Sequence, residues 1–339
     1  MIALTRTDKC FSTISGSLGR IFNTDGKRRT ELNVDECRSA FDFQILKKPS
    51  YDETGRKIPG HFHIIRSDNG DFIPSSGLGK KFVPIQHKDI FDSVVKEIIP
   101  LANEVMPNVP RLELETVGTL HGGGTGICTV RVGEPFTVPG DSSECYVRLV
   151  FANPCNGRGS IIIGCTIVRD RCQNQIPVAC GGFSVHHTKN ANIHLSNAMK
   201  CVVAQIEESA NVRDKILRMG DCLLVENDVM SCLDLMIARI HPLTYKQGTS
   251  GYTRQVNVRS EVRTQFYGGD VAMSIKGNSA WKEYNAFTYP IFNPLSMGRN
   301  MDYADIFYSG MIGGKRHLVK KIFDTICEHS GISNQTEDQ

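Results

Sequence analysis

Residues 144–168 read ECYVRLVFANPCNGRGSIIIGCTIV, two apolar runs separated by a segment of Asn, Pro, Gly and Ser. Apolar, β-branched runs bounded by turn-forming residues predict β-strands, here over 146–152 and 160–168. Two similar runs precede them at 111–120 and 127–132, and the glycine-rich segment between those two predicts a hairpin turn rather than a phosphate-binding loop. Four short strands joined by tight turns predict an antiparallel meander.

Helical periodicity flanks these strands, because apolar residues recur there at steps of three and four. The expected helices cover residues 89–99, 190–218, 228–240 and 303–328. Ahead of the first helix, residues 41–46 and 61–66 have strand composition and predict an N-terminal strand pair. The predicted fold class is therefore α+β: an antiparallel β-meander packed with helices, then a helical C-terminal region with a basic, aromatic-rich insertion.

The domain organisation follows from this pattern and from the polar chain ends. We expect a partly loose N-terminal segment over 1–34 and a single α+β domain over 35–328. Within that domain the meander core covers about 88–218 and the C-terminal region about 219–328. A disordered tail is expected over 329–339, where polar residues leave little to bury.

The composition is ordinary for a globular chain, since 40% of the 339 residues are hydrophobic, 22% are charged and the net charge is +3. No apolar run reaches the roughly 18 residues that a membrane span needs, and no signal-peptide block opens the chain. We therefore expect a cytoplasmic protein without a membrane partner. The 12 cysteines contain no C-x-x-C pair, which favours buried thiols, and we expect no metal and no cofactor.

Familiar catalytic motifs are absent from the chain. It has no G-x-S-x-G, no H-E-x-x-H, no Walker A sequence and no deaminase signature. This weakens the prediction of an enzyme without excluding it, and no residue is predicted to be catalytic. His61 and His63 share one face of a predicted strand, which is the minimal geometry for a metal pair. Since no third ligand is evident, a solvated face is the favoured interpretation.

Cationic and amide side chains gather in and after the predicted meander. An antiparallel sheet with one face packed on helices can turn such side chains toward a ligand on its other face. Guanidinium groups suit both phosphate contact and base stacking. The candidate phosphate contacts are Arg131, Arg148, Arg158, Arg169, Arg171, Asn174, His187 and Lys189. The alternatives are separate surface arginines and a structural hydrogen bond for His187.

The C-terminal third holds a second concentration of cations. Residues 241–321 contain eleven Lys or Arg against five Asp or Glu, interleaved with aromatic residues. Cations mixed with aromatic rings are typical of surfaces that follow the backbone of single-stranded nucleic acid and stack its bases. The candidate contacts in this region are Tyr252, Arg254, Arg259, Arg263 and Tyr267, although core packing accounts for some of the neighbouring rings.

Several short boxes also carry a family resemblance. Arg169, Cys172 and Asn174 form an Arg-x-x-Cys-x-Asn box, and His187 with Thr188 forms a His-Thr pair. Together with the segments 41–43 (FDF), 64–68 (IIRSD), 82–86 (FVPIQ) and 278–286 (NSAWKEYNA), they resemble domain-of-unknown-function family 932, carried by phages and plasmids. The resemblance covers roughly residues 35–325. The chain departs from the usual pattern at His186 and Gln175, where the family has Arg and Thr.

The family has no established activity, so the resemblance implies a phage or mobile-element setting and no particular reaction. The order helix, meander, helix also resembles the core of phage single-strand annealing proteins. The leading hypothesis is a protein that binds or anneals single-stranded DNA as an oligomer. One alternative is a nucleotide or small-molecule enzyme with a pocket at Arg169, Asn174 and His187. Another is a phage protein that binds and inhibits a host factor.

Overall fold

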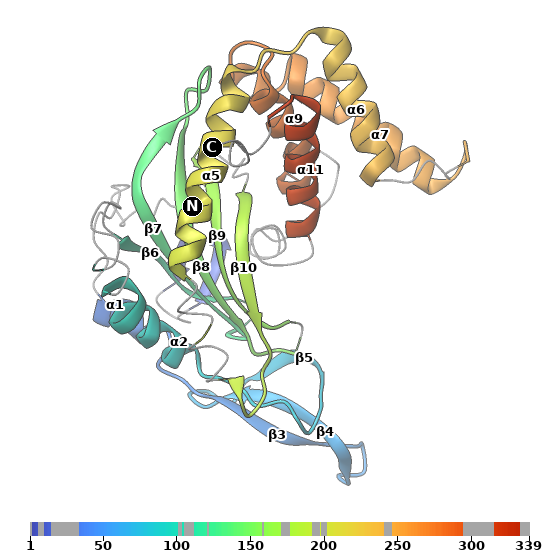
Figure 1. Ribbon diagram of the computed structural model, residues 1–339. Helices are drawn as coiled ribbons and strands as arrows, with labels where there is room; N and C mark the ends of the chain where they lie inside the picture. Colours follow the sequence, from blue (N-terminus) through green and yellow to red (C-terminus); the bar gives the residue numbers. More distant parts are fainter. Residues whose placement is uncertain are drawn as a thin grey trace. The chain divides into compact units, whose positions relative to one another are not determined.

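The computed structural model describes residues 2–5, 10–14, 34–100, 104, 112–120, 122–157, 159–170, 177–191, 197, 202–240, 246–293 and 315–332. The described chain has the predicted α+β fold, with two-, three- and five-stranded sheets and a set of helices (Figure 1). The strands are β1 (Ile2–Thr5), β2 (Cys10–Ile14), β3 (Ile45–Tyr51), β4 (Lys57–Arg66), β5 (Phe72–Leu78), β6 (Leu112–Leu120), β7 (Thr125–Thr137), β8 (Glu144–Pro154), β9 (Ile161–Asp170) and β10 (Pro177–Val185). The helices are α1 (Val34–Ser39), α2 (His87–Ser93), the π-helix η1 (Val94–Ile98), α5 (Val202–Asp221), α6 (Glu226–Ile240), α7 (Ser250–Tyr267), α8 (Asp270–Ser274), α9 (Ala280–Phe292) and α11 (Lys315–His329).

The five-stranded sheet is the predicted meander. Its strand order β10-β9-β8-β7-β6 follows the chain, and β6 pairs with β7 in antiparallel register. The glycine run forms the turn between these two strands, where Gly122 and Gly123 adopt positive φ angles of 65° and 90° that favour glycine. A fifth strand, β10, was not predicted. In β8 all ten residues after Glu144 are buried, so both faces of that strand are covered.

The three-stranded sheet has the order β3-β4-β5, and it contains one more strand than the predicted pair. Its inner face carries Ile45, Ile64 and Ile73, which are at most 2% exposed and share a core with Phe43 and Leu78. This alternation of buried and exposed positions is what a sheet with one covered face requires.

The chain divides into two compact units. Unit 1 comprises Met1–Glu134, Val147–Thr166 and Gly181–Glu207, and unit 2 comprises Pro135–Tyr146, Ile167–Cys180 and Glu208–Gln339. The predicted single domain over 35–328 and the loose chain ends stay predictions.

The helices confirm most of the periodicity argument. The predicted helix over 89–99 is formed by α2 and η1, and α6 matches the prediction for 228–240. The predicted helices over 190–218 and 303–328 correspond to α5 and α11, although 192–196, 198–201 and 303–314 lie outside the described residues. None of the helices in the described part of the chain combines the length and apolar character that a membrane span requires.

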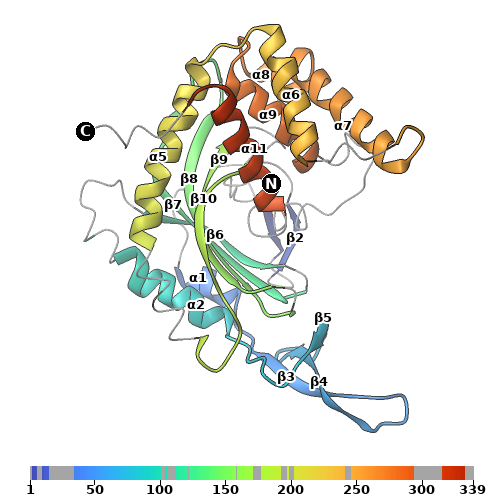
Figure 2. The ribbon, with the colours of Figure 1, turned by 45° about the vertical axis from the view of Figure 1, so that its right-hand side comes forward.

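The predicted basic, aromatic-rich insertion is itself helical. Within unit 2, α7 packs on α9, and α9 packs on α11 (Figure 2). Local caps begin these helices: Thr249 accepts a hydrogen bond from the Tyr252 amide, and Ser279 accepts one from the Lys282 amide, each at 3.3 Å.

Candidate nucleic-acid interface

One face of α7 carries an exposed stripe of cations and tyrosines. At 3.6 residues per turn, positions 252, 256, 259, 263 and 267 lie on the same side of the helix. Val256 is 47% exposed, Tyr267 is 45% exposed and Tyr252 is half-buried, while Arg259 and Arg263 are exposed. We call Tyr252, Val256, Arg259, Arg263 and Tyr267 the α7 stripe. It brings together four of the five residues predicted in this region.

The fifth, Arg254, lies elsewhere on the same helix. It is exposed, but it is nine residues from Arg263 and therefore half a turn around the helix from the stripe. Arg259 is not wholly free, since its Nη2 lies 2.6 Å from Asp234 Oδ1 on α6. Both side chains of this ion pair are about half exposed, so water screens it and it holds Arg259 only weakly.

The end of the stripe has a defined electrostatic setting. The pKa of Tyr267 is raised mainly by partial burial of the ring and to a smaller extent by the nearby carboxylate of Glu226. The guanidinium of Arg263 lowers this pKa. The phenol therefore stays uncharged at neutral pH. An uncharged ring beside a guanidinium can stack on a base without repelling the adjacent phosphate.

Of the predicted groove of the meander, the structure describes five residues, and Lys189 is the one among them that is exposed. Arg148 lies on β8 and is 2% exposed, because both faces of that strand are covered. Arg131 on β7 is half-buried, and Lys189 is exposed. Arg158, Arg171 and Asn174 lie outside the described residues. The expectation that Arg148 faces a ligand on an open sheet face is therefore wrong.

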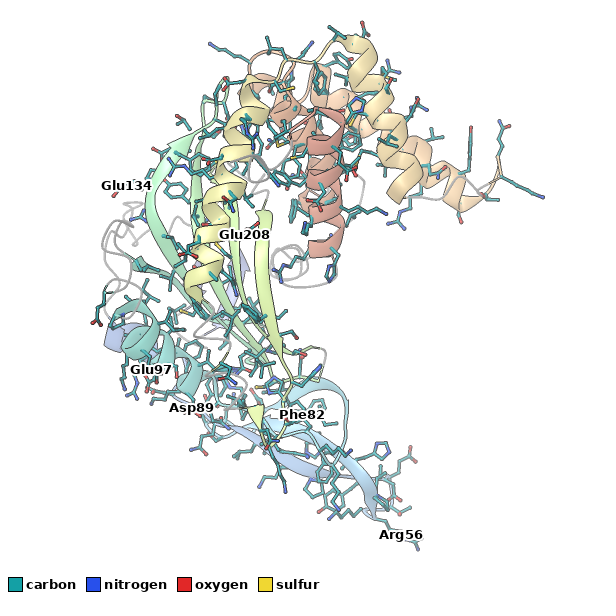
Figure 3. All side chains as sticks on the ribbon, viewed as in Figure 1. Arg56, Phe82, Asp89, Glu97, Glu134 and Glu208 are labelled. Atoms are coloured by element: carbon teal, nitrogen blue, oxygen red, sulfur yellow. The ribbon has the colours of Figure 1, made fainter. Side chains whose placement is uncertain are left out.

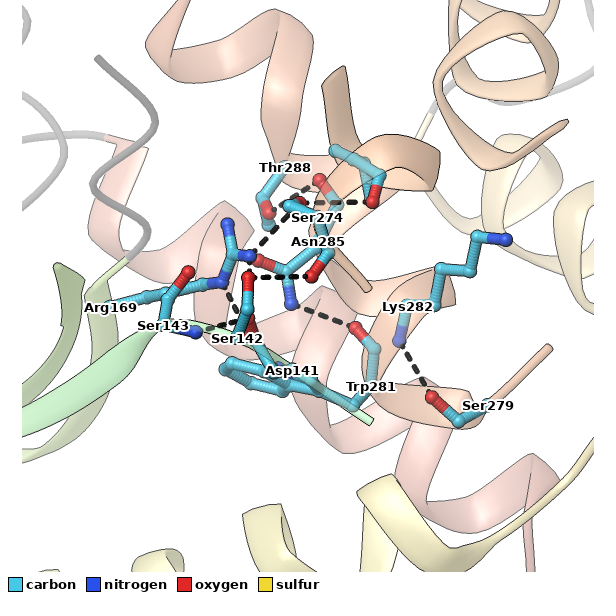
Figure 4. Close-up of polar contacts among 11 residues, drawn as sticks. Asp141, Ser142, Ser143, Arg169, Ser274, Ser279, Trp281, Lys282, Asn285 and Thr288 are labelled. Atoms are coloured by element: carbon cyan, nitrogen blue, oxygen red, sulfur yellow. Dashed lines mark hydrogen bonds and ion pairs between the residues drawn. The ribbon is translucent and has the colours of Figure 1, made fainter. Parts of the chain in front are cut away.

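Arg169 is buried in unit 2 and bound to a carboxylate (Figure 4). Its Nε donates to Asp141 Oδ2 at 2.6 Å, and its Nη2 donates to Asp141 Oδ1 at 2.8 Å and to Ser274 Oγ at 3.0 Å. The side chains of Arg169 and Asp141 are 1% and 0% exposed. The prediction of a phosphate contact at Arg169 is thus overturned, because its donors are occupied by an internal partner.

The Asp141 carboxylate is the centre of this network. Besides Arg169 it accepts hydrogen bonds from Trp281 Nε1 at 2.8 Å and from the Ser143 amide at 2.9 Å. Four donors thus neutralise one buried acid, which is the condition under which a charge tolerates burial. The network joins the turn after β7, the strand β9 and the helix α9. We call Asp141, Arg169, Ser274 and Trp281 the Asp141 cluster.

A second buried polar network lies in unit 1 around His87 at the start of α2. Its Nε2 lies 2.9 Å from the Gly123 carbonyl and its Nδ1 lies 2.9 Å from Asn153 Nδ2. Because the Gly123 carbonyl can only accept and the Asn153 amide can only donate, the ring is a neutral imidazole protonated at Nε2. Burial lowers the pKa of His87 to about 4, although the bond to Gly123 opposes this shift.

The upstream family boxes surround His87. The rings of Phe41 and Phe43 each lie 5.9 Å from the imidazole, and Arg66 packs over Phe43 with its Cζ 4.1 Å from the ring centroid. Arg66 is also bound to Asp68, with Nη2 2.6 Å from Oδ2. Phe41, Phe43 and Arg66 from these boxes are therefore buried beside His87, whereas Asp68 is partly exposed.

His187 belongs to unit 1 and is 5% exposed. Its ring packs on Phe82 with centroids 5.0 Å apart, and its carbonyl accepts from the Val83 amide at 3.1 Å. Burial lowers the pKa of His187 to about 4, which keeps the ring neutral. The prediction that His187 contacts a phosphate is wrong, because its side chain is buried. Arg169 belongs to unit 2 and His187 to unit 1, and Asn174 lies outside the described residues, so the pocket expected at these three residues stays a prediction.

Sequence reasoning missed three residues. Asp141 and His87 are the centres of buried networks, and no local pattern marks either of them. The exposed Phe72 on β5 was missed because that strand was not predicted. Among the described residues no group of three or more His, Cys, Asp or Glu is arranged to bind a metal ion. His61 and His63 lie on the outer side of β4, one exposed and one half-buried.

No curated protein and no solved structure shows a significant match to the chain. A family model described as Domain of unknown function (DUF932) matches residues 76–292. This region contains the boxes at 82–86, 169–174, 187–188 and 278–286, while those at 41–43 and 64–68 precede it. It covers more than half of the sequence. The chain therefore belongs to the DUF932 family of domains of unknown function, as its sequence boxes indicated.

Proposed function

We propose that this chain is a phage or mobile-element protein that binds single-stranded nucleic acid, with the α7 stripe as a contact surface. The observation that carries the proposal is the arrangement of Tyr252, Arg259, Arg263 and Tyr267 along one exposed helix face. Along this face Arg259 and Arg263 lie between the rings of Tyr252 and Tyr267, at intervals of seven, four and four residues. Cations beside rings are what stacking of bases beside neutralised phosphates needs. A single strand offers unpaired bases to those rings, whereas a duplex does not.

The fold is consistent with a role in strand annealing by an oligomer. The order α2, β6 to β10, α5 keeps the helix, meander, helix sequence that phage single-strand annealing proteins also have. Likeness of element order concerns the fold alone, so annealing and DNA recombination belong to the proposal. Leu223, Val225 and Met273 are 74%, 64% and 72% exposed, so unit 2 offers apolar side chains to a second copy of the chain.

The test compares two arginines of the same helix. Binding of a fluorescently labelled single-stranded oligonucleotide is followed by anisotropy at several salt concentrations. Arg263→Gln is expected to weaken binding and to reduce the slope of log affinity against log salt by about 0.7, the value for one phosphate contact on a single strand. Arg254→Gln removes the same charge from the opposite face and is expected to leave that slope unchanged.

An equal effect of both variants would show that only net charge matters and would overturn the assignment of the stripe. Absence of oligonucleotide binding by the unmodified chain would overturn the function. Light scattering coupled to size-exclusion chromatography, with and without the oligonucleotide, reports the oligomeric state in the same samples. A monomer in both conditions would remove the oligomer from the proposal.

A further inference from the structure

The outer face of the three-stranded sheet is a second candidate surface, in unit 1. Directly opposite residues of antiparallel strands project to the same face. The register pairs Leu46 with Ile65, Lys48 with His63 and Ile65 with Phe72. These five residues therefore share one face. We call them the sheet platform.

Aromatic surface is exposed at the centre of the sheet platform. Phe72 is 59% exposed, although a ring of this size is usually buried. The His63 ring lies beside it, with ring centroids 5.7 Å apart and planes inclined by 46°. Ser50 Oγ lies 3.4 Å from His63 Nδ1, which positions this imidazole. The two rings thus form a preorganised pair that is open to solvent.

One cation lies beside this pair of rings, and other exposed cations lie at the ends of the same sheet. Lys48 is exposed and lies opposite His63 across the two strands. Arg56 stands at the tip of the β3–β4 hairpin (Figure 3), and the exposed Lys57 follows it. Lys80 and Lys81 follow the end of β5 and are exposed as well.

The acidic residues of the same segment lie in its turns, where Asp71 directly precedes Phe72. Residues 45–81 hold seven Lys or Arg and four Asp or Glu. Asp52 accepts hydrogen bonds from backbone amides of its own turn. Asp68 is bound to Arg66, and Asp71 accepts a hydrogen bond from Asn69. The platform residues themselves are neutral or cationic, which complements an anionic ligand with flat apolar groups.

We propose that the sheet platform binds single-stranded nucleic acid by stacking an unpaired base on Phe72 and His63, with Lys48 at the adjoining phosphate. The choice of ligand rests on the proposed function, whereas the surface is separate from the α7 stripe. Single-stranded nucleic acid is the polymer that offers both required groups, because every base has a π-face and every linkage carries a negative charge. An acidic peptide would satisfy the lysines but would leave the two rings without a planar partner.

The test places a fluorescent reporter on the platform. The chain has a single tryptophan, Trp281, which is 1% exposed and accordingly shielded from a ligand. In Phe72→Trp a second indole stands on the platform, and a thymidine oligonucleotide of about 20 nucleotides is expected to quench its emission by stacking. The matched control is Phe183→Trp, which places an indole at a 39% exposed position on β10 of the same unit and is expected to keep its emission.

Affinity measurements separate this proposal from the function on which it rests. Phe72→Ala is expected to weaken oligonucleotide binding about 5- to 150-fold, the range for loss of one stacking ring. Lys48→Gln is expected to lower the salt slope by about 0.7. If the oligonucleotide still binds and Phe72→Trp shows no more quenching than Phe183→Trp, the platform is wrong and the function stands. If the unmodified chain binds no oligonucleotide, both proposals fail. Capture of a protein on the platform without oligonucleotide quenching also overturns it.

Discussion

Replacing Asp141 by Asn tests whether the Asp141 cluster holds unit 2 together. The carboxylate accepts two hydrogen bonds from Arg169, one from Trp281 and one from the Ser143 amide. An amide at this position keeps the shape of the side chain but removes its charge and turns an NH₂ group toward these donors. The guanidinium of Arg169, which is 1% exposed, is then a buried charge without a counterion. Removing one member of a buried ion pair costs about 3–5 kcal/mol.

We therefore expect Asp141→Asn to lower the free energy of unfolding by about 3–5 kcal/mol, a large share of the roughly 5–15 kcal/mol that stabilises a typical domain. The assay is urea denaturation, followed by far-ultraviolet circular dichroism and by tryptophan emission. The only tryptophan of the chain donates to this carboxylate at 2.8 Å, so its emission reports on the cluster itself. Adding Arg169→Met is expected to recover part of the loss, because the unpaired charge is then gone.

The matched control is Asp324→Asn on α11. Asp324 forms an ion pair with Lys320 at 2.7 Å, close to the 2.6 Å of the Asp141 pair, but its two side chains are 46% and 56% exposed. Water screens such a pair, so the expected loss is below about 0.5 kcal/mol. Equal losses in the two variants, or a loss below about 1 kcal/mol for Asp141→Asn, would refute the reasoning that burial makes this contact important.

Three further expectations concern other parts of the molecule. The unfolded chain binds a proton at His87 near pH 6.5 and the folded chain only near pH 4, so lowering the pH through this window favours unfolding, by about 3 kcal/mol. Urea midpoints at pH 7 and pH 4 should show this loss, and His87→Gln should show a smaller one. Gly126→Ala would place a Cβ 2.6 Å from the His87 ring and should cost about 1–3 kcal/mol in urea denaturation, whereas Gly79→Ala meets no atom within 4 Å and should be neutral. Asp234→Asn breaks the weak surface ion pair of Arg259 and removes a negative charge beside it. Oligonucleotide binding in the anisotropy assay should therefore become about 2- to 5-fold tighter. Weaker binding would contradict this expectation.

The meander and the helices α2 and α6 were predictable because their signals are local. Apolar runs, turn residues and a terminal proline lie within the elements themselves. The helix α7 was not predicted, because its buried residues include Gln255 and Gln265 beside Val262 and Phe266. Its apolar residues alone therefore show no helical period. Its Thr249 cap was the available signal. The strand β10, PVACGGFSV, was not predicted, because its glycines interrupt the apolar run.

The candidate site was harder to predict, because the acid that binds a cation internally, and so withholds it from a phosphate, is distant in sequence. Asp141 is 28 residues from Arg169 and 140 residues from Trp281. One local signal does separate buried cations from exposed ones. Residues 146–152 form a continuous apolar run, which indicates a strand buried on both faces, and a cation such as Arg148 inside that run must be buried too.

Strand β4, by contrast, alternates between inward and outward positions over its second half, so His61 and His63 reach the outer face. The helix α7 buries few of its residues, and its arginines stay in solvent. A buried cation must be paired with an internal acid, and it is then not available to a phosphate. A phosphate can contact only a cation that stays in solvent. The nucleic-acid contacts of this chain are therefore to be sought on the alternating sheet and the polar helix, and the arginines of the continuous apolar strands are to be assigned to stability.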